Sequence, residues 1–196
     1  MFSEIVRKYA RVFLEPLARF ISWTGVSPNV VTVTGFVLMV GVAFVLAWGH
    51  FLWGGILITA FALFDAVDGT LARMMGRTSR FGAFLDSTLD RFSEAVIFLG
   101  LFVYYVGQDR NLELILIYAT VVGSLMVSYA RARAEGIGVP LKDGLLTRFE
   151  RVTLLVVGLV FNQMTIILWV LAILSNLTAI QRMYLVWRIT GGEKGG

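Results

Sequence analysis

Cysteine is absent from this chain of 196 residues, and histidine occurs once, as His50. Without cysteine the protein has no disulfide bonds and no thiol chemistry. Charge is also scarce, because only 15% of the residues are Asp, Glu, Lys or Arg, against about 25% in an ordinary soluble domain. No zinc-finger spacing and no aromatic-basic RNA motif occurs, so we expect no nucleic-acid partner. His50 separates two apolar runs and is interpreted as an interfacial loop residue.

Hydrophobic residues make up 58% of the chain, and the mean hydropathy is +0.80. The sequence therefore predicts an all-α integral membrane protein with six transmembrane helices. The expected spans cover about residues 29–48, 51–73, 82–106, 112–129 and two parts of 150–187. The last tract is too long for one crossing of about 20 residues, and Asn162-Gln163 is its natural break. Ser27 and Pro28 predict the N-cap and first residue of the first span.

The first 22 residues predict an amphipathic helix that lies in the membrane interface, because apolar and charged residues follow opposite stripes. Its charges also interrupt any apolar run, which argues against a signal peptide. We divide the chain into this helix at 1–22, a membrane domain at 23–190 and a disordered tail at 191–196. No internal repeat and no soluble domain are expected.

Basic residues predict the orientation. Lys and Arg collect near the N-terminus, between the second and third spans, between the fourth and fifth, and near the C-terminus, whereas the other side holds only Arg110. Positively charged loops stay on the cytoplasmic side. We therefore expect a multi-pass protein of the cell membrane, with both termini and the aspartates described next on the cytoplasmic side.

Four aspartates stand out in this apolar sequence: Asp65, Asp68, Asp86 and Asp90. On helices the first two share a face at i and i+3, and the other two share a face at i and i+4. Burying four negative charges in a membrane is costly unless cations or water compensate them. Such oxygen ligands suit Mg²⁺, Mn²⁺ or Ca²⁺. Solvent-exposed helix ends are the alternative, but the flanking apolar runs leave little room for them.

These aspartates belong to a longer pattern, D-x2-D-G-x2-A-R-x8-G-x3-D-x3-D, which runs from Asp65 to Asp90. In this pattern the chain resembles the CDP-alcohol phosphatidyltransferase family. The resemblance implies that an alcohol hydroxyl attacks the β-phosphorus of a CDP-linked lipid, either CDP-diacylglycerol or CDP-archaeol, and that CMP leaves. It also implies a homodimer.

The resemblance assigns roles to the signature residues. Asp65, Asp68 and Asp86 would bind one or two Mg²⁺ or Mn²⁺ ions, and Asp90 would be a further metal ligand and the general base. The expected contacts of the CDP-lipid are Pro28, Asn29, Val30, Val31, Gly69, Ala72, Arg73, Ser79 and Gly82.

Arginines further along the chain point to a phosphate on the acceptor, because a guanidinium binds phosphate oxygens through two N–H groups. The stretch from Ser128 to Glu135 is similar to the S-Y-x-[KR]-A-R-A-E motif of the family's inositol-phosphate branch. The E-R-P-E-R element of that branch reads T-R-F-E-R here, with Phe149 in place of proline. By this resemblance the acceptor is 1D-myo-inositol 3-phosphate, and its phosphate is held by Ser128, Arg131, Arg148, Arg151 and Arg182.

Three alternatives remain at this stage. Glycerol 3-phosphate also carries a phosphate and would suit the same basic residues. A divalent-cation transporter would use intramembrane carboxylates, but we expect none in the outer half of the bundle. A non-catalytic scaffold conflicts with the presence of every signature position.

Overall fold

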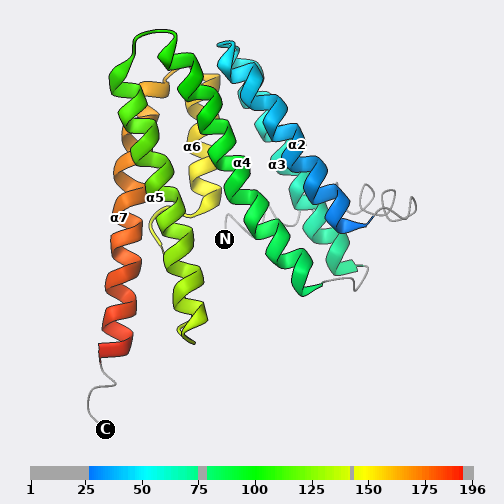
Figure 1. The fold of residues 1–196 in the computed structure, drawn as a ribbon, viewed down its shortest axis with the longest axis vertical. Coiled ribbons are helices and arrows are strands. Elements are labelled where there is room, and N and C mark those ends of the chain that lie inside the picture. The colour runs from blue at the N-terminus through cyan, green and yellow to red at the C-terminus, as the bar shows by residue number, and fades with distance from the viewer. Residues whose placement is uncertain (1–26, 75–78, 142–143, 192–196) are drawn as a thin grey trace.

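A computed structural model describes residues 27–74, 79–141 and 144–191, with the side chains of 63–74 outside the description. These ranges contain six helices and no strand, which confirms the all-helical prediction (Figure 1). The helices are α2 Pro28–Ala47, α3 Phe51–Met74, α4 Arg80–Val106, α5 Asn111–Gly136, α6 Arg148–Val160 and α7 Met164–Thr190. The interfacial helix expected at 1–22 and the tail from residue 192 lie outside the described residues.

The six helices form a closed ring. α2 packs on α3 and α4, α4 packs on α5, α5 packs on α7, and α6 joins α7 to α3. Figure 1 shows α5 and α7 along one flank and α2 and α3 along the other. By length and composition α2, α5 and α7 can each cross a membrane. We call the end where α2 and α4 begin the site end, and the end with the turns 48–50, 107–110 and 161–163 the far end.

Local sequence explains where the helices begin and end. Pro28 occupies the first turn of α2, where its missing N–H costs nothing. α6 begins with a capping box, in which the Thr147 backbone N–H donates to Glu150 Oε2 at 2.8 Å. α6 and α7 are separated at the predicted break, where Asn162 has a φ of 54°. Asn tolerates this left-handed conformation better than most residues.

Two close contacts hold the ring together. A Cβ added at Gly100 of α4 would lie 2.3 Å from the Ala43 carbonyl oxygen of α2, so only glycine fits there. On the other flank, Gly123 of α5 lies against Ser175 and Asn176 of α7. Asn176 Nδ2 also donates to the Ala119 carbonyl oxygen across this seam, at 2.9 Å. Small residues and interhelical hydrogen bonds of this kind drive helix association in membranes.

α6 is the short member of the ring. It has 13 residues, which corresponds to about 20 Å of helix, whereas the hydrocarbon core is about 30 Å thick. Figure 1 shows that its first turn lies well above the lower ends of α5 and α7. The start of α6 therefore lies part-way along the bundle, at a distance from the site end.

Candidate active site

The structure brings together three of the residues expected to bind the CDP-lipid. Ser79 is the N-cap of α4, and its Oγ accepts a hydrogen bond from the Gly82 N–H at 2.8 Å. A Cβ added at Gly82 would lie 3.0 Å from Ser79 Oγ and 3.1 Å from Asn29 Oδ1. The start of α2 therefore meets the start of α4 around a glycine, as the sequence predicts. Of the other lipid contacts expected at the start of α2, Val31 is buried and Val30 is exposed.

The signature aspartates lie on the two predicted helices. Asp65 and Asp68 belong to the last part of α3, together with the expected lipid-binding residues Gly69, Ala72 and Arg73, and the side chains of all five fall outside the description. Asp86 and Asp90 lie one turn apart on α4.

The described side chains include no cluster of three metal-binding groups. They do provide the two α4 carboxylates at a spacing that suits oxygen coordination of a hard divalent cation. The α4 half of the predicted metal site therefore fits, and the α3 half stays a prediction.

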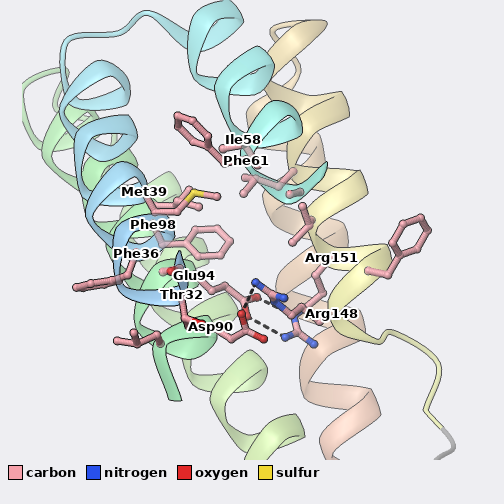
Figure 2. Close-up of a pocket in the computed structure, with 18 of the residues that line it drawn as sticks. Thr32, Phe36, Met39, Ile58, Phe61, Asp90, Glu94, Phe98, Arg148 and Arg151 are labelled. Atoms are coloured by element: carbon pink, nitrogen blue, oxygen red, sulfur yellow. Dashed lines mark hydrogen bonds and ion pairs between the residues drawn. The ribbon is translucent and has the colours of Figure 1, made fainter. Parts of the chain in front are cut away.

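A cavity of about 340 Å³ opens between four helices of the ring, next to Asp90. Its interior is apolar and its mouth carries charged groups. Figure 2 shows the charged side chains of α4 and α6 pointing toward one another at the mouth, with Phe36, Met39, Ile58, Phe61 and Phe98 behind them. An amphiphilic substrate would match this division, with its head at the mouth and apolar groups inside.

Two ion pairs cross the mouth from α4 to α6. Arg151 donates from Nε and Nη2 to the two carboxylate oxygens of Glu94, at 2.7 and 2.9 Å. One turn nearer the site end, Arg148 Nη2 lies 2.8 Å from Asp90 Oδ1. The Arg151 side chain is 3% exposed and the Arg148 side chain 42%. Two of the four arginines expected at the acceptor site therefore reach the cavity, and each faces a carboxylate.

The other expected acceptor residues lie outside the lining of this cavity. Arg182 is buried, and its Nη1 donates to the Val127 carbonyl oxygen of α5 at 2.6 Å. Arg131 is half exposed and pairs with Glu135 on the same helix, at 2.8 Å. Arg182 nevertheless interacts electrostatically with both Arg131 and Arg151. The basic residues thus form one positive region, of which the arginines of α6 are the part that lines the cavity.

Residues of α7 fix the loop that precedes α6. The Leu145 N–H donates to Gln181 Oε1, and the Leu146 N–H donates to Thr178 Oγ1, both at 3.1 Å. Thr178 is fully buried. α7 therefore determines where α6 starts and, through it, where Arg148 lies.

Sequence reasoning missed the role of Glu94. A usable signal was present, because Glu94 continues the spacing of four that joins Gly82, Asp86 and Asp90. Residues at this spacing share a helix face, so a third carboxylate was predictable at the same face of α4. Its partner was not, because Arg151 lies 57 residues away along the chain.

A buried acid at the far end corrects one expectation. Glu113 lies in the first turn of α5, and its side chain is 3% exposed. Its Oε1 accepts from Thr165 Oγ1 at 2.8 Å and lies 3.7 Å from Arg110 Nη1. The prediction that the outer half holds no such carboxylate is therefore wrong. Since Glu113 links α5 to α7 and lies in the first turn of a helix, where an acid favours the helix dipole, it has a structural explanation.

Known proteins are similar to this chain in both sequence and fold. A sequence profile of the CDP-alcohol phosphatidyltransferase family matches residues 25–186. This chain belongs to that family. It is 40% identical over 203 residues to phosphatidylinositol phosphate synthase of Streptomyces avermitilis, covering 94% of this chain and 83% of the relative. It is 35% identical over 180 residues to archaetidylinositol phosphate synthase of Pyrococcus horikoshii, covering 91% of this chain and 93% of the relative.

Solved structures agree. Phosphatidylinositol phosphate synthase of Mycobacterium tuberculosis with CDP-DAG bound superposes with a TM-score of 0.84 at 33% identity, over 89% of this chain and 93% of that one. The same enzyme in complex with manganese and citrate gives 0.83 at 34%, over 89% of this chain and 88% of that one. As a CDP-alcohol phosphatidyltransferase, the chain is an enzyme with a membrane-embedded helical fold, which confirms the family and fold expected from the aspartate signature.

Proposed function

We propose that this CDP-alcohol phosphatidyltransferase transfers the phosphatidyl or archaetidyl group of a CDP-linked lipid to 1D-myo-inositol 3-phosphate and releases CMP. The observation that supports this most is the mouth of the cavity, where Asp90, the aspartate expected to activate a hydroxyl, pairs with Arg148, and where Arg151 lies one helical turn away. The two relatives named above, from a bacterium and an archaeon, are a phosphatidylinositol phosphate synthase and an archaetidylinositol phosphate synthase.

Donor binding is assigned to the site ends of α2, α3 and α4. Asp65, Asp68 and Asp86, with Asp90, would hold one or two divalent cations, of which Mg²⁺ is the proposed one and Mn²⁺ is compatible. When bound, such a cation would neutralise and orient the pyrophosphate oxygens of the donor. Arg73 would bind the same pyrophosphate. The small residues Gly69, Ala72 and Gly82 let the nucleotide approach the helices, and Asn29 and Ser79 lie beside Gly82 to meet it.

Acceptor activation is assigned to Asp90. A carboxylate close to cations stays ionised at neutral pH, as a general base requires. It lies at the charged mouth of the cavity, where a hydroxyl of a phosphorylated polyol is able to reach it. Arg148 and Arg151 on α6 would place the acceptor's phosphate, and the neighbouring Arg182, Arg131 and Ser128 would extend this positive region toward α5 and α7.

The assembly and its orientation are also proposals. The membrane domain covers 23–190, and we infer a homodimer with both termini and the site end in the cytoplasm. The basic residues near the site end favour this orientation. A water-soluble, phosphorylated acceptor would then enter from the cytoplasm. Whether the lipid tails are ester- or ether-linked follows from the membrane in which the enzyme resides.

A two-acceptor assay tests this function. Purified enzyme in detergent with CDP-diacylglycerol, or with CDP-archaeol, is given labelled inositol 3-phosphate or labelled glycerol 3-phosphate, and CMP and labelled lipid are measured. We expect stoichiometric CMP release and label incorporation with the inositol phosphate alone. Both should stop on chelation with EDTA and return with Mg²⁺. Incorporation of glycerol phosphate instead would overturn the acceptor, and divalent-cation uptake into proteoliposomes without CMP release would overturn the enzyme class.

A further inference from the structure

The charges at the mouth of the cavity balance. Asp90 and Glu94 on α4 carry two negative charges, and Arg148 and Arg151 on α6 carry two positive ones, one opposite each acid. The two guanidinium groups differ in how firmly they are held, and this difference suggests separate tasks for them.

Arg151 is fixed. Its Nε and Nη2 bind both oxygens of Glu94, its Nη1 lies 3.5 Å from the Leu146 carbonyl oxygen, and its side chain is almost fully buried. Leaving Glu94 would strand two charges in a dry interior, which is very costly.

Arg148 is held differently. It is the first residue of α6, its side chain is 42% exposed, and the ion pair joins its Nη2 to Asp90 Oδ1. Its partner Asp90 is 18% exposed, so water reaches and screens this pair at the Arg148 end more than it does the Arg151–Glu94 pair. Its long side chain is therefore able to swing toward another anion without loss of the fold.

Asp90 has a second binding partner in the proposed function, which makes it a ligand of a divalent cation. A guanidinium and a cation compete for the same carboxylate oxygens. A dication held at Asp90 repels the Arg148 guanidinium and weakens its pair with that carboxylate. The acceptor's phosphate then offers Arg148 another anion.

We propose that Arg148 is exchanged between two anions: it pairs with Asp90 in the resting enzyme and turns to the acceptor's phosphate when Asp90 acts as a cation ligand. This rests on the proposed function. By linkage, cation and acceptor then raise each other's affinity by the same factor. Arg148 thus delays the assembly of a positively charged site until the substrate that needs it is present.

Binding of Mn²⁺ to the full-length protein tests whether Arg148 competes with a cation for Asp90. The protein is placed in phosphatidylcholine nanodiscs without CDP-lipid, and free Mn²⁺ is measured by electron paramagnetic resonance. We expect Arg148→Gln to bind Mn²⁺ about three- to tenfold more tightly than the wild type, because the competing cation is gone. Arg148→Lys, which keeps the charge, should lie closer to the wild type. Arg188→Gln, an exposed arginine near the end of α7, controls for net charge and should change nothing. Equal or weaker Mn²⁺ binding by Arg148→Gln would overturn the proposal.

The same titration with saturating 1D-myo-inositol 3-phosphate tests whether Arg148 turns to the acceptor's phosphate. The wild type should gain Mn²⁺ affinity severalfold, and Arg148→Gln should gain much less. An equal gain in both proteins would mean that the phosphate contacts the cation without Arg148, and absence of a gain in the wild type would also overturn the exchange. The two-acceptor assay shows separately whether inositol phosphate is a substrate, so failure of the exchange is distinguishable from failure of the proposed function.

Discussion

The two ion pairs between α4 and α6 have the same chemistry but different surroundings. Glu94 and Arg151 are 12% and 3% exposed and meet through two hydrogen bonds. Asp90 and Arg148 are 18% and 42% exposed. Burial makes the first pair a constraint, because separating two charges in a dry interior is costly. Solvent access at Arg148 lets the second pair reorganise when a ligand arrives. About one helical turn therefore separates a pair that holds α4 to α6 from the pair that we propose serves the reaction.

The largest effect is expected from a substitution that removes the acid of the Asp90–Arg148 pair. Asp90→Asn should lower turnover by about 10²–10⁴-fold, because the neutral amide cannot accept the hydroxyl proton. CDP-lipid binding should survive, as measured by isothermal titration in detergent. Asp109→Asn is the matched control, since Asp109 lies in an exposed turn at the far end with a φ of 55°, which Asn also tolerates. Unimpaired product formation by Asp90→Asn would remove Asp90 from the role of general base.

The next largest effect is expected from breaking the buried Glu94–Arg151 pair. Glu94→Gln leaves the Arg151 guanidinium without its counterion and should lower the free energy of unfolding by about 3–5 kcal/mol. Unfolding in mixed micelles, followed by circular dichroism, measures this loss. Glu135→Gln makes the same change in the exposed pair with Arg131, where both side chains are about half exposed, and should cost less than about 0.5 kcal/mol. Similar losses in the two variants would contradict the difference drawn between buried and exposed pairs.

A double variant sharpens this result. Glu94→Gln combined with Arg151→Met removes both buried charges, so most of the lost stability should return. Activity should not return with it, because the proposed phosphate-binding arginine is absent. Recovery of both stability and activity would show that Arg151 serves the fold alone.

The smallest expected effect comes from loosening the hydrogen bonds by which α7 holds the loop before α6, because that loop positions both arginines. Thr178→Val removes the hydroxyl that accepts from the buried Leu146 N–H at 3.1 Å, which should cost about 1–2 kcal/mol of stability. Because the start of α6 then loosens, the KM for the acceptor should rise severalfold. Thr153→Val is the control, since Thr153 is exposed on α6 and bonds only within its own helix in the described contacts. An unchanged KM would show that α7 does not position the arginines.

Much of the fold was predictable because the bilayer sets strict rules. Apolar runs gave helix limits close to those observed, and the break at Asn162-Gln163 was correct because the tract exceeds one crossing. The meeting of Asn29 with Ser79 and Gly82 is also consistent with the family resemblance, which assigns all three to one ligand. In each case the information lies within one helix or in a spacing shared with the family.

The partners of the charged residues were not predictable. The four acceptor arginines looked alike in sequence, yet Arg151 is buried against Glu94 and Arg182 donates to the Val127 carbonyl of α5. These contacts join segments far apart in the chain, and they depend on how deeply α6 is placed. That depth results from hydrogen bonds between a loop and α7, for which the sequence carries no periodic pattern.

The depth of the site has a consequence for the membrane around it. Asp90 follows Arg80, the first residue of α4, by ten positions, which corresponds to about 15 Å along the helix axis. This is comparable to half the thickness of the hydrocarbon core, about 15 Å. In the proposed orientation, with the start of α4 at the membrane surface, a hydrophilic acceptor would descend below the headgroups to reach Asp90. Bilayer thickness then becomes a kinetic variable, and the same enzyme should work at different speeds in short-chain and long-chain lipids.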